Sequence, residues 1–535
     1  MEKLLLRGGT VYDGTGAAPV RADVLLAEGT VAAIAPDLPA GDARCLDVRG
    51  KAVTPGFLDS HRHGDFAAFT DPAFGTAELA QGITTALVGN CGMSAAPVTQ
   101  TSRAPWYAFL EPCLGRPPAG REFGTFEAYL RALEAQGVPL ELGALVGMGT
   151  LITAARGWAS GPWETAQADT VRALLCEALD AGALGISCGI MYVPECYSTA
   201  QDYARLLRPA ARYGRPLCCH LRGEGDSLVQ AVAEAVEIAA RAGVPLNISH
   251  FKVFGRQNWG RTLPRAVEVI EAARAKGQDV TVDFYPYCGG STTLLTLVPP
   301  CCSKATVEET LAYLATSRGV EQLRREILRP QPGWDNMVQS IGWERVLLSS
   351  VVTEQNRPYQ GLDLTQIAAR CGDADEAACM ARLLCEEAGK AGIIVMSMSG
   401  EDVDLVARLP YAAVISDALY GAPDHPHPRL YGAFPRVLHD LVQQRGVLTL
   451  TQAVHKMTGL TARRFGLADR GLLRPGLRAD VNVFDPALVR DTATFARPKA
   501  LAAGLDLVLL GGVPAWEKGA RVPGAAGRVL RAPQS

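Results

Sequence analysis

Several residues that could bind a metal stand directly after apolar runs of the kind that form buried strands. They are His61 and His63 after VTPGFLDS, Cys91 after TTALVGN, His220 after PLCC, His250 after VPLNIS and Asp417 after AAVIS. Neutral imidazole and thiolate are the ligands that zinc prefers, and a carboxylate can bind metal or move a proton. Each histidine taken singly is more often a core or surface residue. The repetition at strand ends favours a metal site.

The first pair of histidines, His61 and His63, has the spacing that a strand needs to aim two side chains at one point. Residues i and i+2 face the same side of a strand, so both imidazoles would face one metal if the strand continues through them. The intervening Arg62 would then point away. The alternative is a surface pair without a function.

Cys91 has three interpretations. It could be a buried structural thiol, a nucleophile with a neighbouring base, or a thiolate ligand of zinc. The flanking Gly89, Asn90 and Gly92 would permit a tight turn beside a metal. Because histidines that could bind zinc follow other apolar runs, the interpretation of Cys91 as a zinc ligand is favoured.

A second motif, Gly185 to Gly189, matches the G-x-S-x-G pattern of serine hydrolases. That pattern needs a strand before the serine and a helix directly after it. Here MYVPECY follows, with Pro194 and no helical periodicity. The match is therefore interpreted as coincidental.

Composition narrows the class of protein. The chain has 535 residues, a net charge of -3 and a hydrophobic fraction of 48%. Nothing in this balance favours nucleic acid or a membrane as a partner, and no apolar run reaches the length of a membrane span. None of the 14 cysteines forms a C-x-x-C pair. Reduced thiols and a cytoplasmic location are expected.

The elements that must position these residues alternate along the chain. Apolar runs predict strands near 53–61, 83–90, 141–147, 183–188, 215–220, 244–250, 279–285, 345–351, 393–398 and 411–417. Segments with helical periodicity lie between several of them and end at Gly243 and before Gly277. This alternation is typical of a parallel α/β fold, in which functional side chains gather at the carboxyl ends of the strands. A closed barrel needs eight strands, so two of the ten must lie elsewhere.

The pattern also divides the chain. Residues 1–52 and 466–535 alternate short apolar runs with turns, which predicts one small β domain built from both ends. Residues 53–465 carry the strand–helix alternation. The alternation of strands and helices is interrupted at about 287–345, which predicts an inserted lid or subdomain.

Longer blocks make the chain resemble the amidohydrolase superfamily, and within it the N-acyl-D-amino-acid deacylase (D-aminoacylase) family. The blocks are TPGFLDSHRHGD at 54–65, GITTALVGNCGMSAAP at 82–97, CHLRGEGD at 219–226, ISHFKVFGRQNWG at 248–260, DFYPYCGGS at 283–291, HPRLYGAFPRVL at 427–438 and the closing stretch at 458–486. They follow the family's order over nearly the whole chain.

The resemblance implies a (β/α)8 TIM-type barrel, a small β-sandwich domain from both termini and an inserted lid. It implies zinc held tightly by Cys91, His220 and His250, with His61, His63 and Asp417 around a second, weakly occupied position. It also implies that Lys252, Tyr285 and Ser291 bind the substrate carboxylate. Arg222 and Glu224 are either orienting residues for the ligands or ordinary loop charges.

The implied activity is hydrolysis of the amide bond of N-acyl-D-amino acids, small-molecule substrates, by metal-activated water with Asp417 as the acid and base. The same scaffold also serves cyclic amide hydrolysis, as in hydantoinases and dihydroorotases. Those relatives commonly bridge two metals with a carboxylated lysine, and the Cys91 block favours the linear amides over this alternative. A non-catalytic scaffold is the third hypothesis.

Two departures from the family pattern bear on the pocket. Members often read GSDG around the aspartate, where this chain has Ser416 to Leu419, and many carry a histidine where this chain reads Val146 to Thr150. The sequence leaves open the stereochemistry, the acyl group, the side chain, the metal count and the oligomeric state.

Overall fold

A computed structural model describes residues 3–304, 306–331, 334–421, 424–524 and 526–533. Its centre is a set of parallel strands in two sheets. The first sheet contains β6 (Phe57–Asp59), β7 (Ile83–Val88) and β8 (Glu141–Ala144). The second contains β9 (Val146–Gly147), β10 (Ile186–Gly189), β11 (Leu217–His220), β12 (Leu246–Ile248), β13 (Val280–Phe284) and β17 (Ala412–Val414). These strands alternate with helices, so the centre is TIM-barrel-like.

Two short seams bring the sheets together. At one seam only Leu145 separates β8 from β9, and its N–H donates to Val88 O at 2.9 Å. At the other seam Arg62, beyond β6, forms an isolated parallel bridge with Ala418, beyond β17. The backbone hydrogen-bond pattern therefore gives two sheets of three and six strands.

The helices around these strands pack against them through their apolar faces. They are α1 (Ala67–Thr70), α2 (Thr76–Ala80), α3 (Arg103–Leu114), α4 (Phe126–Gln136), α5 (Met148–Arg156), α6 (Thr165–Asp180), α7 (Ala200–Leu207), α8 (Leu228–Ala242), α9 (Thr262–Ala275), α15 (Gly400–Arg408), α16 (Arg429–Arg436), α17 (Leu450–Met457) and α18 (Gly459–Arg464). Helix α8 buries a stripe of leucine, valine, isoleucine and alanine at helical spacing and ends where Gly243 takes a φ of 74°. The two helices predicted from periodicity, α8 and α9, are confirmed.

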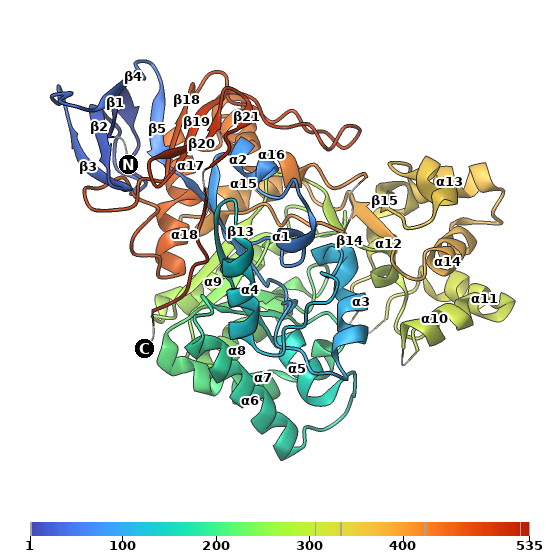
Figure 1. Cartoon of the computed structure of the whole chain (residues 1–535). Coiled ribbons are helices and arrows are strands. Elements are labelled where there is room, and N and C mark those ends of the chain that lie inside the picture. The colour runs from blue at the N-terminus through green and yellow to red at the C-terminus, as the bar shows by residue number, and fades with distance from the viewer. Residues whose placement is uncertain (1–2, 305, 332–333, 422–423, 525, 534–535) are drawn as a thin grey trace.

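Strands from both chain ends form a single nine-stranded sheet. Its members are β1 (Leu4–Val11), β2 (Val20–Ala27), β3 (Thr30–Ala35), β4 (Arg44–Asp47), β5 (Ala52–Pro55), β18 (Val481–Phe484), β19 (Leu505–Leu510), β20 (Val513–Glu517) and β21 (Ala520–Arg521). Figure 1 shows the blue N-terminal strands beside the red C-terminal ones. The single strand predicted over 53–61 is wrong: it divides at Gly56 into β5 of this sheet and β6 of the barrel. Residues 1–2, 525 and 534–535 of the predicted terminal segments lie outside the described residues.

A third body, yellow in Figure 1, interrupts the barrel between β13 and β17. It contains β14 (Gly290–Thr293), β15 (Val346–Ser350), β16 (Gly392–Val395), α10 (Val307–Leu314), α11 (Ser317–Glu326), α12 (Met337–Ile341), α13 (Leu364–Cys371) and α14 (Glu376–Glu386). These elements share a hydrophobic core of their own.

This body explains the two surplus strands of the sequence prediction. The runs at 345–351 and 393–398 form β15 and β16, which pair with each other and with β14 and not with the barrel. The predicted end of the insertion at 345 was therefore too early, because an apolar run does not reveal which sheet it joins. Residues 305 and 332–333 of the predicted insertion lie outside the described residues.

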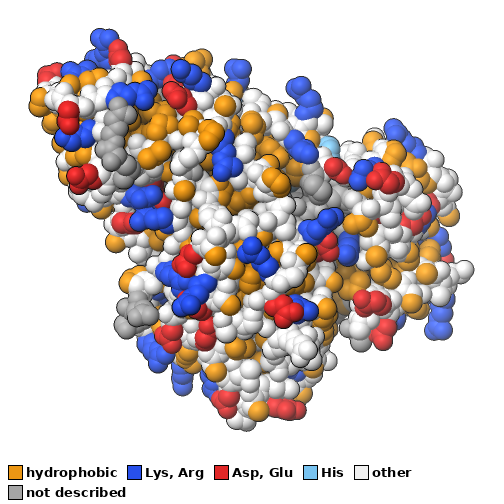
Figure 2. All heavy atoms as spheres, viewed as in Figure 1, with side chains coloured by type: hydrophobic (Ala, Val, Ile, Leu, Met, Phe, Trp, Pro, Cys, Tyr) orange, Lys and Arg blue, Asp and Glu red, His pale blue; other side chains and the backbone are white. Residues whose placement is uncertain are grey.

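The visible face carries charges of both signs. In Figure 2 basic and acidic side chains are interspersed over all three bodies. Among the residues that the structure describes, no helix combines the length and the apolar character that crossing a bilayer requires.

Candidate active site

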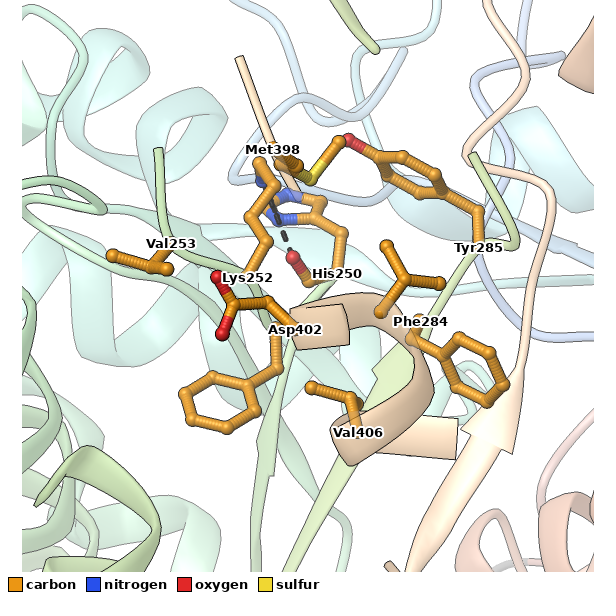
Figure 3. Close-up of a pocket in the computed structure, with 10 residues that line it drawn as sticks. His250, Lys252, Val253, Phe284, Tyr285, Met398, Asp402 and Val406 are labelled. Atoms are coloured by element: carbon orange, nitrogen blue, oxygen red, sulfur yellow. Dashed lines mark hydrogen bonds between the residues drawn. The ribbon is translucent and has the colours of Figure 1, made fainter. Parts of the chain in front are cut away.

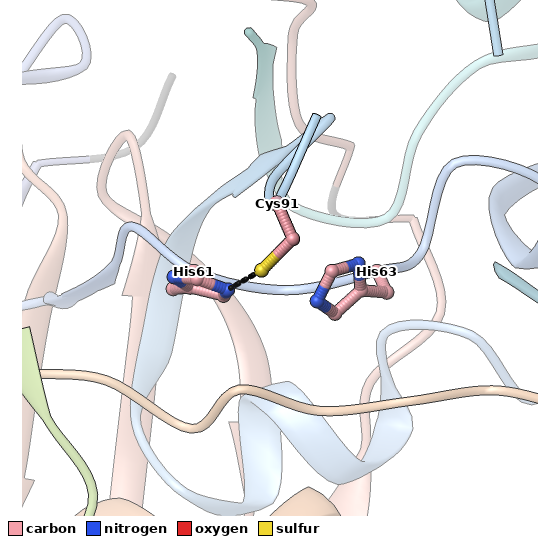
Figure 4. A group of neighbouring side chains, drawn as sticks. All are labelled: His61, His63 and Cys91. Atoms are coloured by element: carbon pink, nitrogen blue, oxygen red, sulfur yellow. Dashed lines mark hydrogen bonds between the residues drawn. The ribbon is translucent and has the colours of Figure 1, made fainter. Parts of the chain in front are cut away.

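The predicted metal ligands meet at the carboxyl ends of the barrel strands. Two groups of three side chains have ligand atoms within 4.8 Å of one another: His61, His63 and Cys91, and Cys91, His220 and His250. Cys91 belongs to both groups. Figure 4 shows its sulfur lying between the His61 and His63 rings. All five side chains are buried.

The distances between these donors fit a zinc ion. With zinc–nitrogen and zinc–sulfur bonds of about 2.1 and 2.3 Å, tetrahedral geometry separates the two ligand atoms by about 3.6 Å. Cys91 Sγ lies 3.3 Å from His61 Nε2 and 3.5 Å from His250 Nε2. Asp417 Oδ1 adds an oxygen 3.5 Å from His61 Nε2 and 3.4 Å from His63 Nε2. Sulfur and nitrogen donors of this kind suit zinc better than magnesium or calcium.

His61 and His63 stand just beyond β6, which ends at Asp59. The backbone remains extended because Arg62 N–H donates to Leu87 O at 3.1 Å and His63 N–H to Ala418 O at 2.9 Å. The i, i+2 geometry predicted for a strand is thus kept by backbone hydrogen bonds to both neighbouring strands. The Arg62 side chain points away from the metal ligands, as predicted, and pairs with Asp59.

The loop that carries Cys91 is fixed by a serine of β10. Ser187 Oγ donates to Gly89 O at 2.5 Å and accepts a hydrogen bond from Gly92 N–H at 2.9 Å. Ser187 is the serine of the G-x-S-x-G match, and it is fully buried. Its hydroxyl is committed to this loop, which agrees with interpreting the motif as coincidental.

Three of the candidate ligands have left-handed backbone conformations that non-glycine residues rarely adopt. Their φ values are 54° for Cys91, 37° for His250 and 51° for Asp417. Each such conformation costs about 1–3 kcal/mol and clusters at functional sites. This strain aims the side chains into the site, and no sequence pattern signalled it.

Burial sets the protonation of the histidines. Removal from water lowers the pKa values of His61, His220 and His250 well below the usual range, so the imidazoles stay neutral and free to bind metal. Burial raises the pKa of the Cys91 thiol, with Asp417 adding to the effect. A bound cation would reverse that shift, because it stabilises the thiolate.

Asp417 is held as a carboxylate by a partner that the sequence analysis missed. Burial alone would raise the pKa of Asp417, but Arg429 and a hydrogen bond with His63 bring it well below the usual value. Arg429 Nη1 lies 2.8 Å from Asp417 Oδ2, and both side chains are buried. Arg429 was visible only as part of the HPRLYG block. Its approach to Asp417 depends on the chain turning back after β17.

Glu224 orients a candidate ligand, and Arg222 does not. Glu224 Oε1 lies 3.0 Å from His250 Nδ1 and 2.6 Å from Lys252 Nζ. Figure 3 shows the Lys252 ammonium beside the His250 ring. Burial lowers the pKa of Lys252, but Glu224 raises it above the usual value, so the ammonium stays charged. Arg222 pairs instead with Glu234 at 2.9 Å.

A pocket with about 680 Å³ of open space lies over these groups. Its lining includes His63, Cys91, His220, His250 and Asp417 together with Lys252, Tyr285 and Ser291, the three predicted carboxylate-binding residues. The inserted body contributes Ser291, Thr292, Met337 and Val395. The pocket therefore joins the predicted metal ligands to the predicted substrate contacts, with the insert as one wall.

The three predicted carboxylate-binding side chains differ in how free they are. The hydroxyl of Tyr285 is buried and has no hydrogen-bond partner in the described structure. Ser291 Oγ donates to Ile393 O at 3.1 Å, and Lys252 is already paired with Glu224. Tyr285 is thus the group that most needs a partner from a ligand.

The two departures from the family pattern have different positions. Met148 begins α5 and is buried away from the residues that line the pocket. Ala418 is buried at the seam, where its carbonyl accepts the His63 N–H. Leu419 does line the pocket. The departure around Asp417 therefore affects the wall of the site, and the departure at Met148 does not.

Comparison with known proteins gives one family. Models of the amidohydrolase family match residues 52–246 and 408–515. A D-aminoacylase of Alcaligenes xylosoxydans xylosoxydans is 35% identical over 98% of this chain and 97% of its own. An N-acyl-D-glutamate deacylase of the same organism is 36% identical, with 99% and 96% covered.

The fold comparison agrees. The crystal structure of N-acyl-D-glutamate deacylase from Bordetella bronchiseptica superposes with a TM-score of 0.82 at 34% identity and covers 99% of each chain. That enzyme was crystallised with zinc and with a phosphonate inhibitor that mimics the tetrahedral intermediate of its reaction.

Proposed function

Because the chain belongs to the D-aminoacylase family of amidohydrolases, we propose that it hydrolyses the amide bond of N-acyl-D-amino acids to a carboxylate and a free D-amino acid. The observation that carries this proposal is the convergence of the two metal-ligand groups with Asp417 in one pocket beside Lys252 and Tyr285. A metal site, a proton carrier and an anion site are the three components that the reaction needs.

Zinc is the cofactor that the donor set supports. Cys91, His220 and His250 form the tight position. His61, His63 and Asp417 form a second, weaker one, to which the shared Cys91 sulfur also contributes. When bound, zinc polarises the acyl carbonyl and activates water for attack. Because the buried histidines are already neutral, zinc binding has to displace a proton only from the Cys91 thiol in the tight position.

Asp417 moves the proton in this mechanism. Its carboxylate accepts a proton from the attacking water and passes it to the leaving amine nitrogen. Arg429 and His63 keep the group ionised before attack, so it begins the cycle as a base. Glu224 Oε1 and Lys252 Nζ both lie against His250 Nδ1, at 3.0 and 2.9 Å, and leave Nε2 directed toward Cys91.

The substrate carboxylate is assigned to the part of the pocket beside His250, where Lys252 and Tyr285 lie. Lys252 supplies a positive charge there, and the free hydroxyl of Tyr285 supplies a hydrogen-bond donor. Ser291 lies on β14, at the start of the inserted body. Binding of the carboxylate therefore links the barrel to the insert.

The arrangement of the two parallel sheets, the terminal sheet and the inserted body is also part of the proposal. We propose that the two parallel sheets close at their seams into an eight-stranded barrel, in which β8 and β9 count as one strand interrupted at Leu145. We also propose that the terminal sheet folds as a sandwich and that the inserted body is a lid. The hydrogen bonds at Leu145 and Ala418 support the closed barrel, the core shared by both chain ends supports the sandwich, and the pocket lining by Met337 supports the lid. Free thiols at all 14 cysteines support a reducing, cytoplasmic location.

The alternatives have less support. Cyclic amide hydrolysis on this scaffold commonly uses a carboxylated lysine between two metals, but here the shared position belongs to Cys91. The lysine of the pocket, Lys252, is paired with Glu224. A non-catalytic scaffold has no need of strained, buried ligands whose donor distances fit zinc.

Paired substrates test the proposal directly. We expect the zinc-loaded chain to release free amine from N-acetyl-D-amino acids and to leave the L-enantiomers essentially intact. Release from hydantoin or dihydroorotate in place of the linear amides would favour the cyclic alternative. A zinc-loaded chain inactive on every amide would favour the scaffold.

The pocket also predicts which side chains are accepted. Its walls include Met93, Met191, Phe254, Met337 and Leu419, and Lys252 is the one lysine or arginine among the described lining residues. An acidic substrate would bury a second carboxylate without a partner. We therefore expect N-acetyl-D-methionine to exceed N-acetyl-D-glutamate in kcat/KM by about 100-fold, equivalent to about 3 kcal/mol.

A gain-of-charge variant sharpens this test. Met337→Arg adds a cation at the pocket wall from α12 and should raise kcat/KM for the D-glutamate substrate while lowering it for D-methionine. The charge-neutral Met337→Gln is the matched control. Equal kcat/KM for the two substrates in the unmodified chain would show that the substrate side chain does not contact this wall of the pocket.

A further inference from the structure

The side chain between the two histidine ligands, Arg62, is the centre of a buried polar cluster at the seam of the barrel. It is 1% exposed, and its guanidinium contacts groups from three elements. Nη1 donates to Asp59 Oδ2 at 2.9 Å and to Ser416 Oγ at 3.2 Å. Nη2 donates to Glu78 Oε1 and to the Tyr420 hydroxyl, each at 2.6 Å.

These contacts cross the seam between β6 and β17. Asp59 ends β6, while Ser416 and Tyr420 flank Asp417 beyond β17, and Glu78 belongs to α2. Asp59 also accepts hydrogen bonds from the Ser416 N–H at 3.0 Å and from the Ser416 hydroxyl at 2.5 Å. The cluster therefore ties the strand end that carries His61 and His63 to the one that carries Asp417.

The backbone alone gives this seam little support. The isolated bridge between Arg62 and Ala418 is accompanied by two hydrogen bonds, His63 N–H to Ala418 O and Asp417 N–H to His61 O, both 2.9 Å. His61 and His63 must nevertheless approach Asp417 Oδ1 at 3.5 and 3.4 Å across it. A short ladder is easily displaced, so the side-chain cluster determines whether the donors meet.

We infer that Arg62 is a positioning residue for the metal position formed by His61, His63 and Asp417. The inference rests on the proposed function, because it concerns the second of the two zinc positions. Cys91 follows β7, His220 ends β11 and His250 lies beyond β12, so the strands that carry His220 and His250 are not those that form this seam. Arg62 acts on one position and leaves the other intact.

A conservative variant isolates the effect. Arg62→Lys keeps the charge, but a single ammonium cannot reproduce the fork of contacts to Asp59, Ser416, Glu78 and Tyr420. Outer partners of metal ligands typically change affinity or activity by 10- to 100-fold. We expect the second zinc affinity to fall by about that factor, while the first zinc affinity and KM change less than about twofold. We expect kcat to fall as well, because Asp417, the proton carrier, lies on the same seam and moves with it.

Arg470 provides the matched control. It is also buried, and its guanidinium pairs with Glu141 at 3.0 Å and with Asp480 at 3.5 Å. Glu141 begins β8, so this cluster lies at the opposite end of the strands from the ligands. Arg470→Lys should lower thermal stability as much as Arg62→Lys, and should leave both zinc affinities and kcat unchanged.

The measurement is calorimetric zinc titration of the metal-stripped full chain, together with thermal unfolding and steady-state kinetics. Tyr420→Phe removes one contact of Arg62 and should weaken the second zinc affinity in the same direction, by a smaller factor, should Arg62→Lys fail to fold. A wild-type chain that binds a single zinc, or a folded variant with both affinities unchanged, would overturn the inference. Neither result would affect the proposed activity, whose failure would instead appear as an inactive wild type.

Discussion

The Asp417→Asn variant is expected to lose turnover by about 10³-fold while it still binds zinc through Cys91, His220 and His250. Asparagine keeps the volume of the side chain and a polar contact with Arg429, but it cannot accept a proton from water. Alanine would in addition leave the buried Arg429 charge without a partner, which costs about 3–5 kcal/mol of stability. Asparagine is therefore the cleaner substitution.

The readouts for this variant are kcat with N-acetyl-D-methionine and zinc content after dialysis. Asp23→Asn is a suitable control, because Asp23 is equally buried but accepts the N–H groups of Gly8 and Leu38 in the terminal sheet. That control should retain its kcat. If Asp417→Asn turned over substrate at near the wild-type rate, Asp417 would have no part in proton transfer.

Replacement of Cys91 by alanine should remove both zinc positions at once. Cys91 is the one residue common to the two ligand groups among the described residues, so its loss leaves each group one donor short. We expect zinc content below about a tenth of an equivalent per chain after dialysis and no measurable amine release, since metal binding requires the full donor set. Removal of His61 alone should spare the Cys91, His220 and His250 group.

Cys188→Ala is the control for this prediction. Cys188 is also a buried free thiol of the barrel, on β10, and it belongs to neither ligand group. Its zinc content and turnover should match the wild type. A Cys91→Ala protein that retained one tightly bound zinc would show that the metal is held by a different set of side chains.

Much of the fold follows from local sequence patterns. The strand and helix periodicities locate β7, β11, β12, β13 and α8 closely, because each period is a local property of the chain. The origin of β15 and β16 could not be predicted in the same way. Their apolar runs look like barrel strands, and only pairing with the distant β14 assigns them to the inserted body.

The same distinction applies to the site. Each candidate ligand could be predicted because parallel strands bring their carboxyl ends together, so a polar residue after an apolar run is informative by itself. The positions of Arg429 and of the cluster around Arg62 could not be predicted in this way. Arg429 meets Asp417 only after the chain reverses, and Arg62 contacts Glu78 on α2 and Tyr420 beyond β17. The left-handed conformations of Cys91 and Asp417 leave no trace in residue type.

We propose that Cys91, His220 and His250 hold a zinc ion that is needed for hydrolysis of N-acyl-D-amino acids. The most direct test strips the chain of metal and returns zinc in steps while amine release from N-acetyl-D-methionine is followed. We expect no release without metal and full activity once about one zinc per chain is bound. Full activity in the metal-free chain, or none at any zinc content, would contradict it.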